Sequence, residues 1–140
     1  YFLAAASDNN SVYIWNIREQ NALILRHSAP IISIDWQPSG EKLISISIDG
    51  NAALWKTGEW KLIDFPAPAY IIFAEFSKDG EYLALGNKAG NIYIYDKELN
   101  QIDEFNLGEP SPTLVWNRNI DLIAGSKSGK LIYLNAKAGM

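Results

Sequence analysis

Residues 47–56, SIDGNAALWK, place a polar turn between two short apolar runs. The Asp49-Gly50 pair suits the positive φ angles of a tight hairpin turn, and the aliphatic and aromatic flanks favour strands. The same layout returns as SDNNSVYIWN at 7–16, NKAGNIYIYD at 87–96 and SKSGKLIYLN at 126–135. The chain therefore repeats one hairpin four times.

The four hairpins are spaced by 40, 40 and 39 residues when they are aligned on their turns. One column contains the turn residues Asn10, Gly50, Gly90 and Gly129. A second column contains the large apolar residues Trp15, Trp55, Tyr95 and Leu134. A third column, ahead of the last three hairpins, contains Trp36, Phe76 and Trp116. A four-stranded unit repeated at about 40 residues is the sequence signature of a propeller blade, so an all-β fold is predicted.

Within the second unit, strands are expected at 31–36, 42–47, 52–56 and 60–65. The run KLISISI alternates, with Ile44, Ile46 and Ile48 on one side and Leu43, Ser45 and Ser47 on the other. The segment REQNALILR at 18–26 is also compatible with a short amphipathic helix. Its register against GEWKLIDF and KELNQIDEF favours a strand.

The stretch RHSAPIISIDWQPSGEKLISISIDGNAALWK at 26–56 resembles a WD repeat. His27 stands where the Gly-His dipeptide of that family has its His, although Arg26 replaces the Gly. Trp55 and Lys56 stand at the Trp-Asp position, and the repeat pattern extends over essentially the whole chain. The last repeats are similar in layout to propellers of a replication-fork adaptor and of intraflagellar-transport subunits, and the pattern does not separate the two.

The resemblance implies a single partial β-propeller of about three and a half four-stranded blades, part of a seven-bladed ring. The expected blades are 1–27 (partial), 28–66, 67–107 and 108–140 (partial). Since open sheet edges aggregate or recruit partners, the remainder of the propeller is expected in the same or another chain.

The composition is that of a soluble globular protein. The 140 residues are 48% hydrophobic and 20% charged, carry a net charge of −4 and include no cysteine. The acidic balance argues against direct nucleic-acid binding, and no apolar run is long enough for a membrane helix. We therefore expect an intracellular protein, cytoplasmic or nuclear, that does not associate with a membrane.

His27, Ser47 and Asp49 supply the residue types of a nucleophilic triad. The resemblance implies another role, in which His27, Ser47, Asp49 and Trp55 form a hydrogen-bonded structural set that ties the strands of one blade together. No Gly-x-Ser-x-Gly elbow accompanies the serine, so the structural role is favoured.

No enzymatic activity, cofactor or metal site is expected. The segment GSKSGK at 125–130 lacks the spacing of a phosphate-binding loop and lies in the turn column of the repeat. KLIYLNAKAG at 130–139 resembles the blade ends of quinoprotein-like propellers, so a ligand- or cofactor-binding propeller of that type remains the alternative.

The expected function is a non-catalytic scaffold for protein–protein interaction within a larger, eukaryotic-type multiprotein assembly. Trp60 and Tyr70 lie outside the aromatic columns and are freer to be at the surface. In a WD-repeat disc, the residue ahead of the turn Asp points outward. The candidate partner-binding face, expected to take an acidic or amphipathic peptide segment, comprises Ile48, Tyr70, Lys88 and Lys127.

Overall fold

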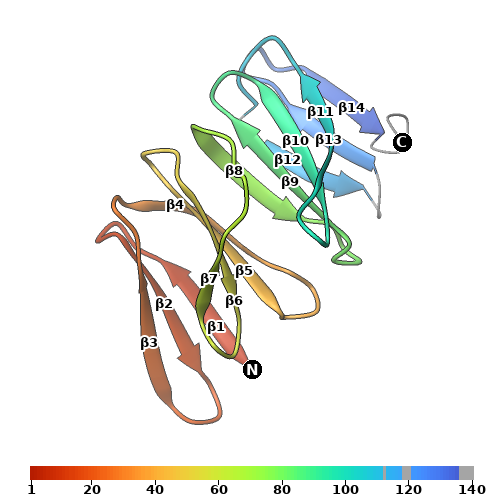
Figure 1. Ribbon diagram of the computed structural model, residues 1–140. Coiled ribbons are helices and arrows are strands. Elements are labelled where there is room, and N and C mark those ends of the chain that lie inside the picture. Colours follow the sequence, from red (N-terminus) through yellow and green to blue (C-terminus); the bar gives the residue numbers. More distant parts are fainter. Residues whose placement is uncertain (112, 118–120, 136–140) are drawn as a thin grey trace.

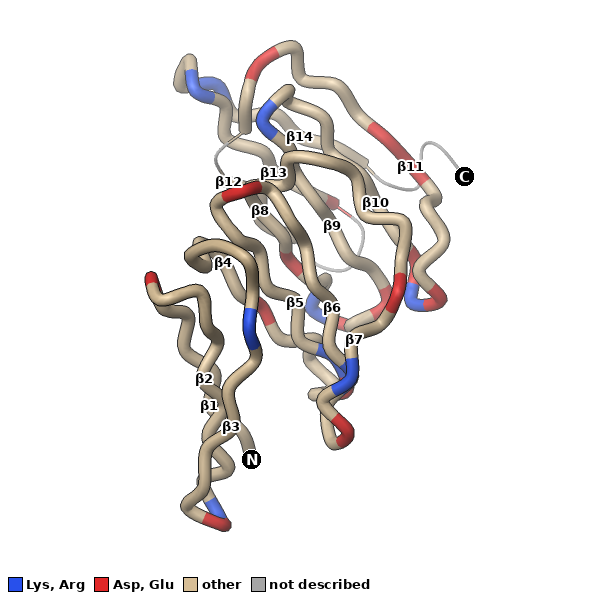
Figure 2. The backbone as a smooth tube through the Cα atoms, turned by 60° about the vertical axis from the view of Figure 1, so that its left-hand side comes forward, with Lys and Arg blue, Asp and Glu red and all other residues tan. Residues whose placement is uncertain are grey.

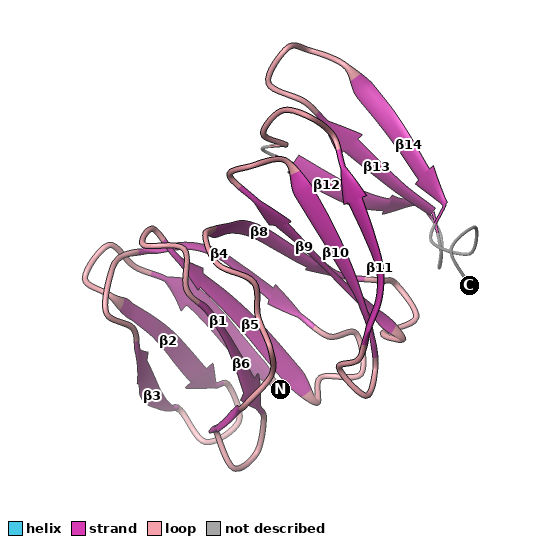
Figure 3. Ribbon diagram, turned by 45° about the horizontal axis from the view of Figure 1, so that its top comes forward, coloured by secondary structure: helices cyan, strands magenta, loops and turns pink. Residues whose placement is uncertain are grey.

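The computed structural model describes residues 1–111, 113–117 and 121–135, and within them every regular element is a β-strand (Figures 1 and 3). Sheet 1 contains β1 (Phe2–Ala6), β2 (Ser11–Asn16) and β3 (Asn21–Arg26). Sheet 2 contains β4 (Ile31–Trp36), β5 (Lys42–Ser47), β6 (Ala52–Lys56) and β7 (Lys61–Ile63). Sheet 3 contains β8 (Ile71–Phe76), β9 (Tyr82–Asn87), β10 (Asn91–Asp96) and β11 (Gln101–Asn106). Sheet 4 contains β12 (Thr113–Asn117), β13 (Asp121–Gly125) and β14 (Leu131–Asn135).

Each sheet is an antiparallel meander in which neighbouring strands follow one another along the chain. The sheets succeed one another like the blades of a propeller, with β4 beside β8 and β8 beside β12 (Figure 1). The predicted all-β fold with propeller blades is therefore confirmed. The segment 18–26 ends in strand β3, as its register indicated.

The core consists of three apolar layers, one between each pair of neighbouring sheets. Because side chains alternate along a strand, sheets 2 and 3 each contribute both faces to these layers, and sheets 1 and 4 each contribute one. The layer between sheets 1 and 2 contains Val12, Ile14, Leu25, Ile31, Leu43 and Trp55. The layer between sheets 2 and 3 contains Ile44, Ile46, Leu54, Ile71, Phe76, Leu83, Leu85 and Tyr95. The layer between sheets 3 and 4 contains Ile92, Ile94, Leu114, Trp116, Leu122 and Leu134.

The turn column adopts the left-handed conformation that its sequence suggests. Asn10 has φ 67°, and Gly50, Gly90 and Gly129 have φ values of 87°, 86° and 85°. Only the fourth strand of sheet 2 differs from the expected bounds, because it covers Lys61–Ile63 and not 60–65. Trp60 belongs to the preceding turn with φ 54°.

Many charged residues lie at the turns at both ends of the sheets, and a further acidic stretch lies along β11 (Figure 2). The fully buried strand positions are mostly apolar or serine. Within the described residues, no helix is long and apolar enough to cross a membrane.

Candidate functional site

His27 lies at the end of β3, half-buried beside sheet 2. Its Nε2 and the Ser45 Oγ share a hydrogen bond of 2.6 Å. The Trp55 indole Nε1 donates to the same oxygen at 2.8 Å. Burial lowers the pKa of His27, although Asp49 opposes the shift. The neutral imidazole, the serine and the indole form a polar cluster that ties sheet 1 to sheet 2.

The hydroxyl in this cluster belongs to Ser45 and not to Ser47, which the sequence interpretation had placed there. Ser45 is opposite Ala53 in the β5–β6 register, and Leu43 is opposite Trp55. The indole therefore lies one same-face position from Ser45. Ser45 and Ser47 share a strand face, so alternation alone could not distinguish the two hydroxyls.

Ser47 belongs to a second cluster at the β5–β6 turn. Its hydroxyl donates to Asp49 Oδ1, and Ser28 Oγ donates to Asp49 Oδ2 at 2.6 Å. The Asn51 amide donates to Oδ2 at 2.9 Å. These hydrogen bonds, that from Ser28 foremost, lower the pKa of Asp49 to about 2. Ser28, which the sequence interpretation did not single out, connects the β3–β4 loop to this turn.

The two clusters do not assemble a nucleophilic triad. Among the described residues, the only serine bonded to His27 is Ser45, which is fully buried and out of reach of a substrate. Ser47 donates to Asp49 directly, without an imidazole between them. The arrangement therefore stabilises the sheets and the loop between them.

The turns and the loops that connect the sheets form one continuous surface, which we call the turn face. It comprises the turns at 7–10, 47–51, 87–90 and 126–130 and the connecting loops at 27–30, 64–70 and 107–111. In three repeats, the turn residue donates its backbone N–H to a connecting-loop carbonyl. These pairs are Ile48–Pro30 at 2.8 Å, Lys88–Tyr70 at 3.2 Å and Lys127–Pro110 at 3.1 Å.

Hydrogen bonds from the next sheet extend this surface. Ile31 N–H donates to the Ser7 carbonyl at 3.2 Å, and Ile71 N–H donates to the Gly50 carbonyl at 3.1 Å. The turn at 47–51 is therefore held between the loop ahead of its own sheet and the first strand of the next, and these contacts are made by backbone atoms.

The four predicted partner-binding side chains all lie on the turn face and are exposed. Ile48 is 56% and Tyr70 66% exposed, and both Lys88 and Lys127 are exposed. Beside Tyr70, a pocket of about 400 Å³ is lined by Asp49, Gly50 and the connecting loop. The position of the four side chains is compatible with a docking surface.

The fourth turn repeats the contact of the second with the chemical roles exchanged. In sheet 2 the loop hydroxyl of Ser28 donates to the turn carboxylate of Asp49. In sheet 4 the turn hydroxyl of Ser128 donates to the loop carboxylate of Glu109 at 2.6 Å. The Ser128 hydrogen bond lowers the pKa of Glu109. Either arrangement fastens a loop to a turn.

The sequence interpretation did not identify an acidic pair formed by Asp35 and Glu75. The two residues lie near the C-terminal ends of β4 and β8, away from the turn face. Asp35 Oδ2 accepts the backbone N–H of Phe76 at 2.7 Å. Glu75 Oε2 is buried without a hydrogen-bond partner. Burial, followed by the charge of Asp35, raises the pKa of Glu75 to about 7. Asp35 and Glu75 occupy equivalent positions, 40 residues apart in the repeat. Nothing in the sequence of a single repeat indicated that the two acidic side chains would lie close together.

Comparison with known proteins identifies one repeat directly. Residues 19–56 match the family described as WD domain, G-beta repeat. The match begins in the turn before β3 and ends with β6, so it joins the last strand of one sheet to three strands of the next. This segment contains His27, Ser45 and Trp55.

The chain is also similar to segments of longer proteins. The chain is 32% identical to Protein NEDD1 of Bos taurus over 102 residues, which are 69% of this chain and 16% of that protein. It is 27% identical to WD repeat and HMG-box DNA-binding protein 1 of Mus musculus over 117 residues, 74% of this chain and 10% of that protein. It is 35% identical to SIR4-interacting protein SIF2 of Saccharomyces cerevisiae over 104 residues, which are 70% of this chain and 19% of that protein. The chain thus spans a minor part of each relative.

Proposed function

The chain belongs to the WD-repeat family, and on that premise we propose that it is a non-catalytic interaction scaffold whose turn face binds a partner protein. Rigid propeller sheets position variable loops, and binding residues concentrate on such loops. The proposed binding residues are Ile48, Tyr70, Lys88 and Lys127.

The conformation of Tyr70 is the observation that supports this proposal most. Tyr70 has φ 61°, an unfavourable backbone conformation for an aromatic residue. Its carbonyl accepts the Lys88 N–H, and its backbone packs so closely on Gly50 that a Cβ there would lie 2.6 Å from Tyr70 Cα. The phenol ring is nevertheless 66% exposed. Strain held by surrounding contacts is typical of functional positions, and a fixed backbone lowers the entropy cost of docking on this ring.

The neighbouring side chains define the chemistry of the proposed partner. Ile48 offers an exposed apolar contact, and Lys88 and Lys127 place two cations on the same face. Apolar anchors give affinity, while charges mainly steer association and fix register. We therefore infer that the turn face takes an acidic or amphipathic segment of another protein, within a larger intracellular assembly of eukaryotic type.

The outermost sheets suggest a second contact, with further propeller blades. Leu3 and Ile24 in sheet 1, and Val115 and Leu131 in sheet 4, are between 42% and 81% exposed. Strand alternation turns these side chains away from the inter-sheet layers. We propose that both faces are covered by the remainder of a propeller, in the same or another chain.

A titration tests the turn face. Peptides selected from a displayed library on the parent chain are titrated against Ile48→Asp and against the Lys88→Glu/Lys127→Glu double variant, at low and high salt. Ile48→Asp is expected to weaken binding at both salt concentrations, and the double variant chiefly at low salt. Ile17→Asp is the matched control, because Ile17 is 60% exposed but lies in the turn between β2 and β3 at the other end of sheet 1. Folded turn-face variants that bind as tightly as the parent would remove this surface from consideration.

A further inference from the structure

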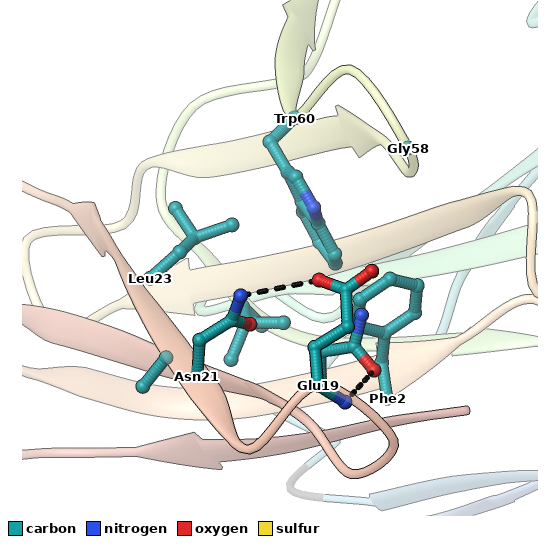
Figure 4. A pocket seen from close by; sticks show the side chains of 9 residues that line it. Phe2, Glu19, Asn21, Leu23, Gly58 and Trp60 are labelled. Carbon is teal, nitrogen blue, oxygen red and sulfur yellow. Dashed lines mark hydrogen bonds between the residues drawn. The ribbon is translucent and has the colours of Figure 1, made fainter.

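A pocket of about 430 Å³ lies between sheets 1 and 2, at the end of the sheets opposite the turn face (Figure 4). One side comes from the start of β1 and the β2–β3 turn, and the other from the β6–β7 turn. Its volume is in the range of small-ligand pockets. It is lined by Phe2, Ile14, Asn16, Glu19, Asn21, Ala22, Leu23, Gly58 and Trp60.

Two aromatic rings form its walls. The Phe2 and Trp60 rings meet edge to face, with centroids 5.2 Å apart. Trp36 supports Trp60 from behind, again edge to face at 6.1 Å. Phe2 is 39% exposed, and Trp60 is partly exposed. The pocket therefore presents π surfaces that are held in place by other rings.

Glu19 is the only ionisable side chain among the residues that line the pocket. Figure 4 shows its carboxylate between the Asn21 side chain and the Phe2 ring, with the Trp60 indole above. Asn21 Nδ2 donates to Glu19 Oε2 at 3.1 Å, and Asn16 Oδ1 accepts the Glu19 N–H at 3.3 Å. Across the described ranges Glu19 has no ion-pair partner. The exposed carboxylate thus lies beside aromatic rings, is held by one hydrogen bond and has no ion-pair partner within the described residues.

We propose that this pocket binds the cationic side chain of an arginine or lysine from a partner protein. Cations are attracted to the faces of aromatic rings, and a nearby carboxylate adds a charge-assisted hydrogen bond. The net charge of −4 favours the approach of a basic segment. The proposal rests on the scaffold role proposed above and adds to it a basic contact, distinct from the acidic or amphipathic one at the turn face.

A second pocket, lined by residues of sheet 2, differs from the first in its charged side chains. A pocket of about 350 Å³ occupies the equivalent position, 40 residues on, beside the β5 and β6 ends. There Lys42 stands in place of Phe2, and Lys56 in place of Asn16. Glu59, the counterpart of Glu19, is bound to Lys56 at 2.9 Å and to Lys61 at 3.2 Å. Glu41 also lines the second pocket, which therefore holds charges of both signs. The carboxylate of Glu59 is already paired with two lysines, whereas that of Glu19 has no such partner among the described residues.

The test uses capped peptides Gly-Ser-Arg-Ser-Gly and Gly-Ser-Lys-Ser-Gly, with citrulline and glutamate versions as neutral and acidic controls. Binding to the chain is followed by NMR through the Trp60 indole N–H, which Trp60→Phe assigns by its disappearance. We expect the two basic peptides to shift this resonance, and Glu19→Gln to weaken their binding about three- to tenfold. Trp60→Leu is expected to weaken it about two- to fivefold.

Glu98→Gln is the matched control, since Glu98 occupies the same position in the β10–β11 turn and should leave binding unchanged. Equal binding of the citrulline peptide, no shift of the Trp60 resonance, or full affinity in Glu19→Gln would each overturn the proposal. Glu19 is exposed, so Glu19→Gln decides the matter even if Trp60→Leu fails to fold. If peptides still bind the turn face in an Ile48-dependent manner, only the pocket is refuted and the scaffold role stands.

Discussion

At the scale of single residues, Ser45 connects the ring nitrogens of a half-buried histidine and a buried tryptophan, His27 and Trp55. Its oxygen receives the Trp55 N–H and shares a hydrogen bond with His27, while the serine itself has no exposed surface. A buried polar group left without a partner is costly, whereas an intact network specifies how the strands pack. The contribution of Ser45 to stability therefore depends on the partners that would lose a hydrogen bond if its hydroxyl were removed.

Ser45→Ala and His27→Ala are each expected to lower the free energy of unfolding by about 1–3 kcal/mol. Ser45→Ala leaves the buried Trp55 N–H without its partner, and His27→Ala removes a hydrogen bond to Ser45 and the edge-to-face contact with Trp55. The double variant should lose less than the sum of the two, since both remove the same bond. Urea unfolding of the four proteins measures the coupling. Ser33→Ala is the control, because Ser33 is half-buried in β4 and its hydroxyl forms no hydrogen bond within the described residues. Strict additivity would show that the two residues do not act together.

Two groups give stability an opposite dependence on pH. His27 has a pKa below 6.5 in the fold, so its contribution is complete above 6.5 and is lost as the pH falls through that lowered pKa. Glu75 has a pKa raised from 4.5 to about 7, so its contribution is complete below 4.5 and is lost as the pH rises through about 7. The charge of Asp35 raises the pKa of Glu75, and the charge of Lys78 lowers it.

Glu75→Gln should therefore be more stable than the parent at about pH 8 and lose this advantage at about pH 4. In His27→Gln, the loss of stability on acidification below 6.5 should be smaller than in the parent. Urea unfolding across this pH range measures both. A parallel pH profile for parent and Glu75→Gln would exclude Glu75 as a titrating group.

At the scale of elements, the turns decide how neighbouring sheets meet. Gly50 and Gly129 occupy the same turn column and have nearly the same φ, 87° and 85°. Around Gly50 the backbone of Tyr70 leaves no room for a Cβ, whereas no neighbouring atom of the described part of the chain lies within 4 Å of a Cβ on Gly129. Substitutions at Gly50 and Gly129 therefore allow the cost of the left-handed backbone conformation to be separated from the cost of packing against the connecting loop.

Gly129→Ala is expected to lower the free energy of unfolding by about 1–2 kcal/mol through its left-handed conformation alone. Gly50→Ala should cost at least about 1 kcal/mol more, because the connecting loop must move away. Chemical denaturation compares the two variants, and the Tyr70 NMR resonances should shift only in Gly50→Ala. Equal losses would show that the close approach of Tyr70 does not contribute.

The same elements show what the sequence could and could not predict. Periodicity placed the hairpins, because a turn pair such as Asp49-Gly50 and alternating apolar residues are local properties. The shortening of β7 was not predicted, although Pro66 and Pro68 follow closely and cannot donate to a strand ladder. The choice of Ser45 over Ser47 depends on the β5–β6 register and on the loop that carries His27. Such contacts are non-local and leave no mark in a single repeat.

At the scale of the whole molecule, the four sheets bury only the faces that they share. Between sheets the apolar residues form continuous layers, but Leu3 and Ile24 on sheet 1 and Val115 and Leu131 on sheet 4 remain 56%, 42%, 48% and 81% exposed. Contiguous exposed apolar surface of this kind marks an interaction site or promotes association. The same alternation that builds each inner layer therefore leaves an outer face that requires a cover.

The chain studied alone is accordingly expected to self-associate through these two faces. Its average mass in sedimentation experiments should rise with concentration, and the Val115→Lys/Leu131→Lys variant should shift it toward the monomer. The melting temperature should change little, because both side chains lie outside the apolar layers. Ile17→Lys is the control, since Ile17 is equally exposed but lies in a turn. A parent that stays monomeric at about 100 μM, where exposed apolar faces of this kind should associate, would contradict the inference that these faces are built to be covered.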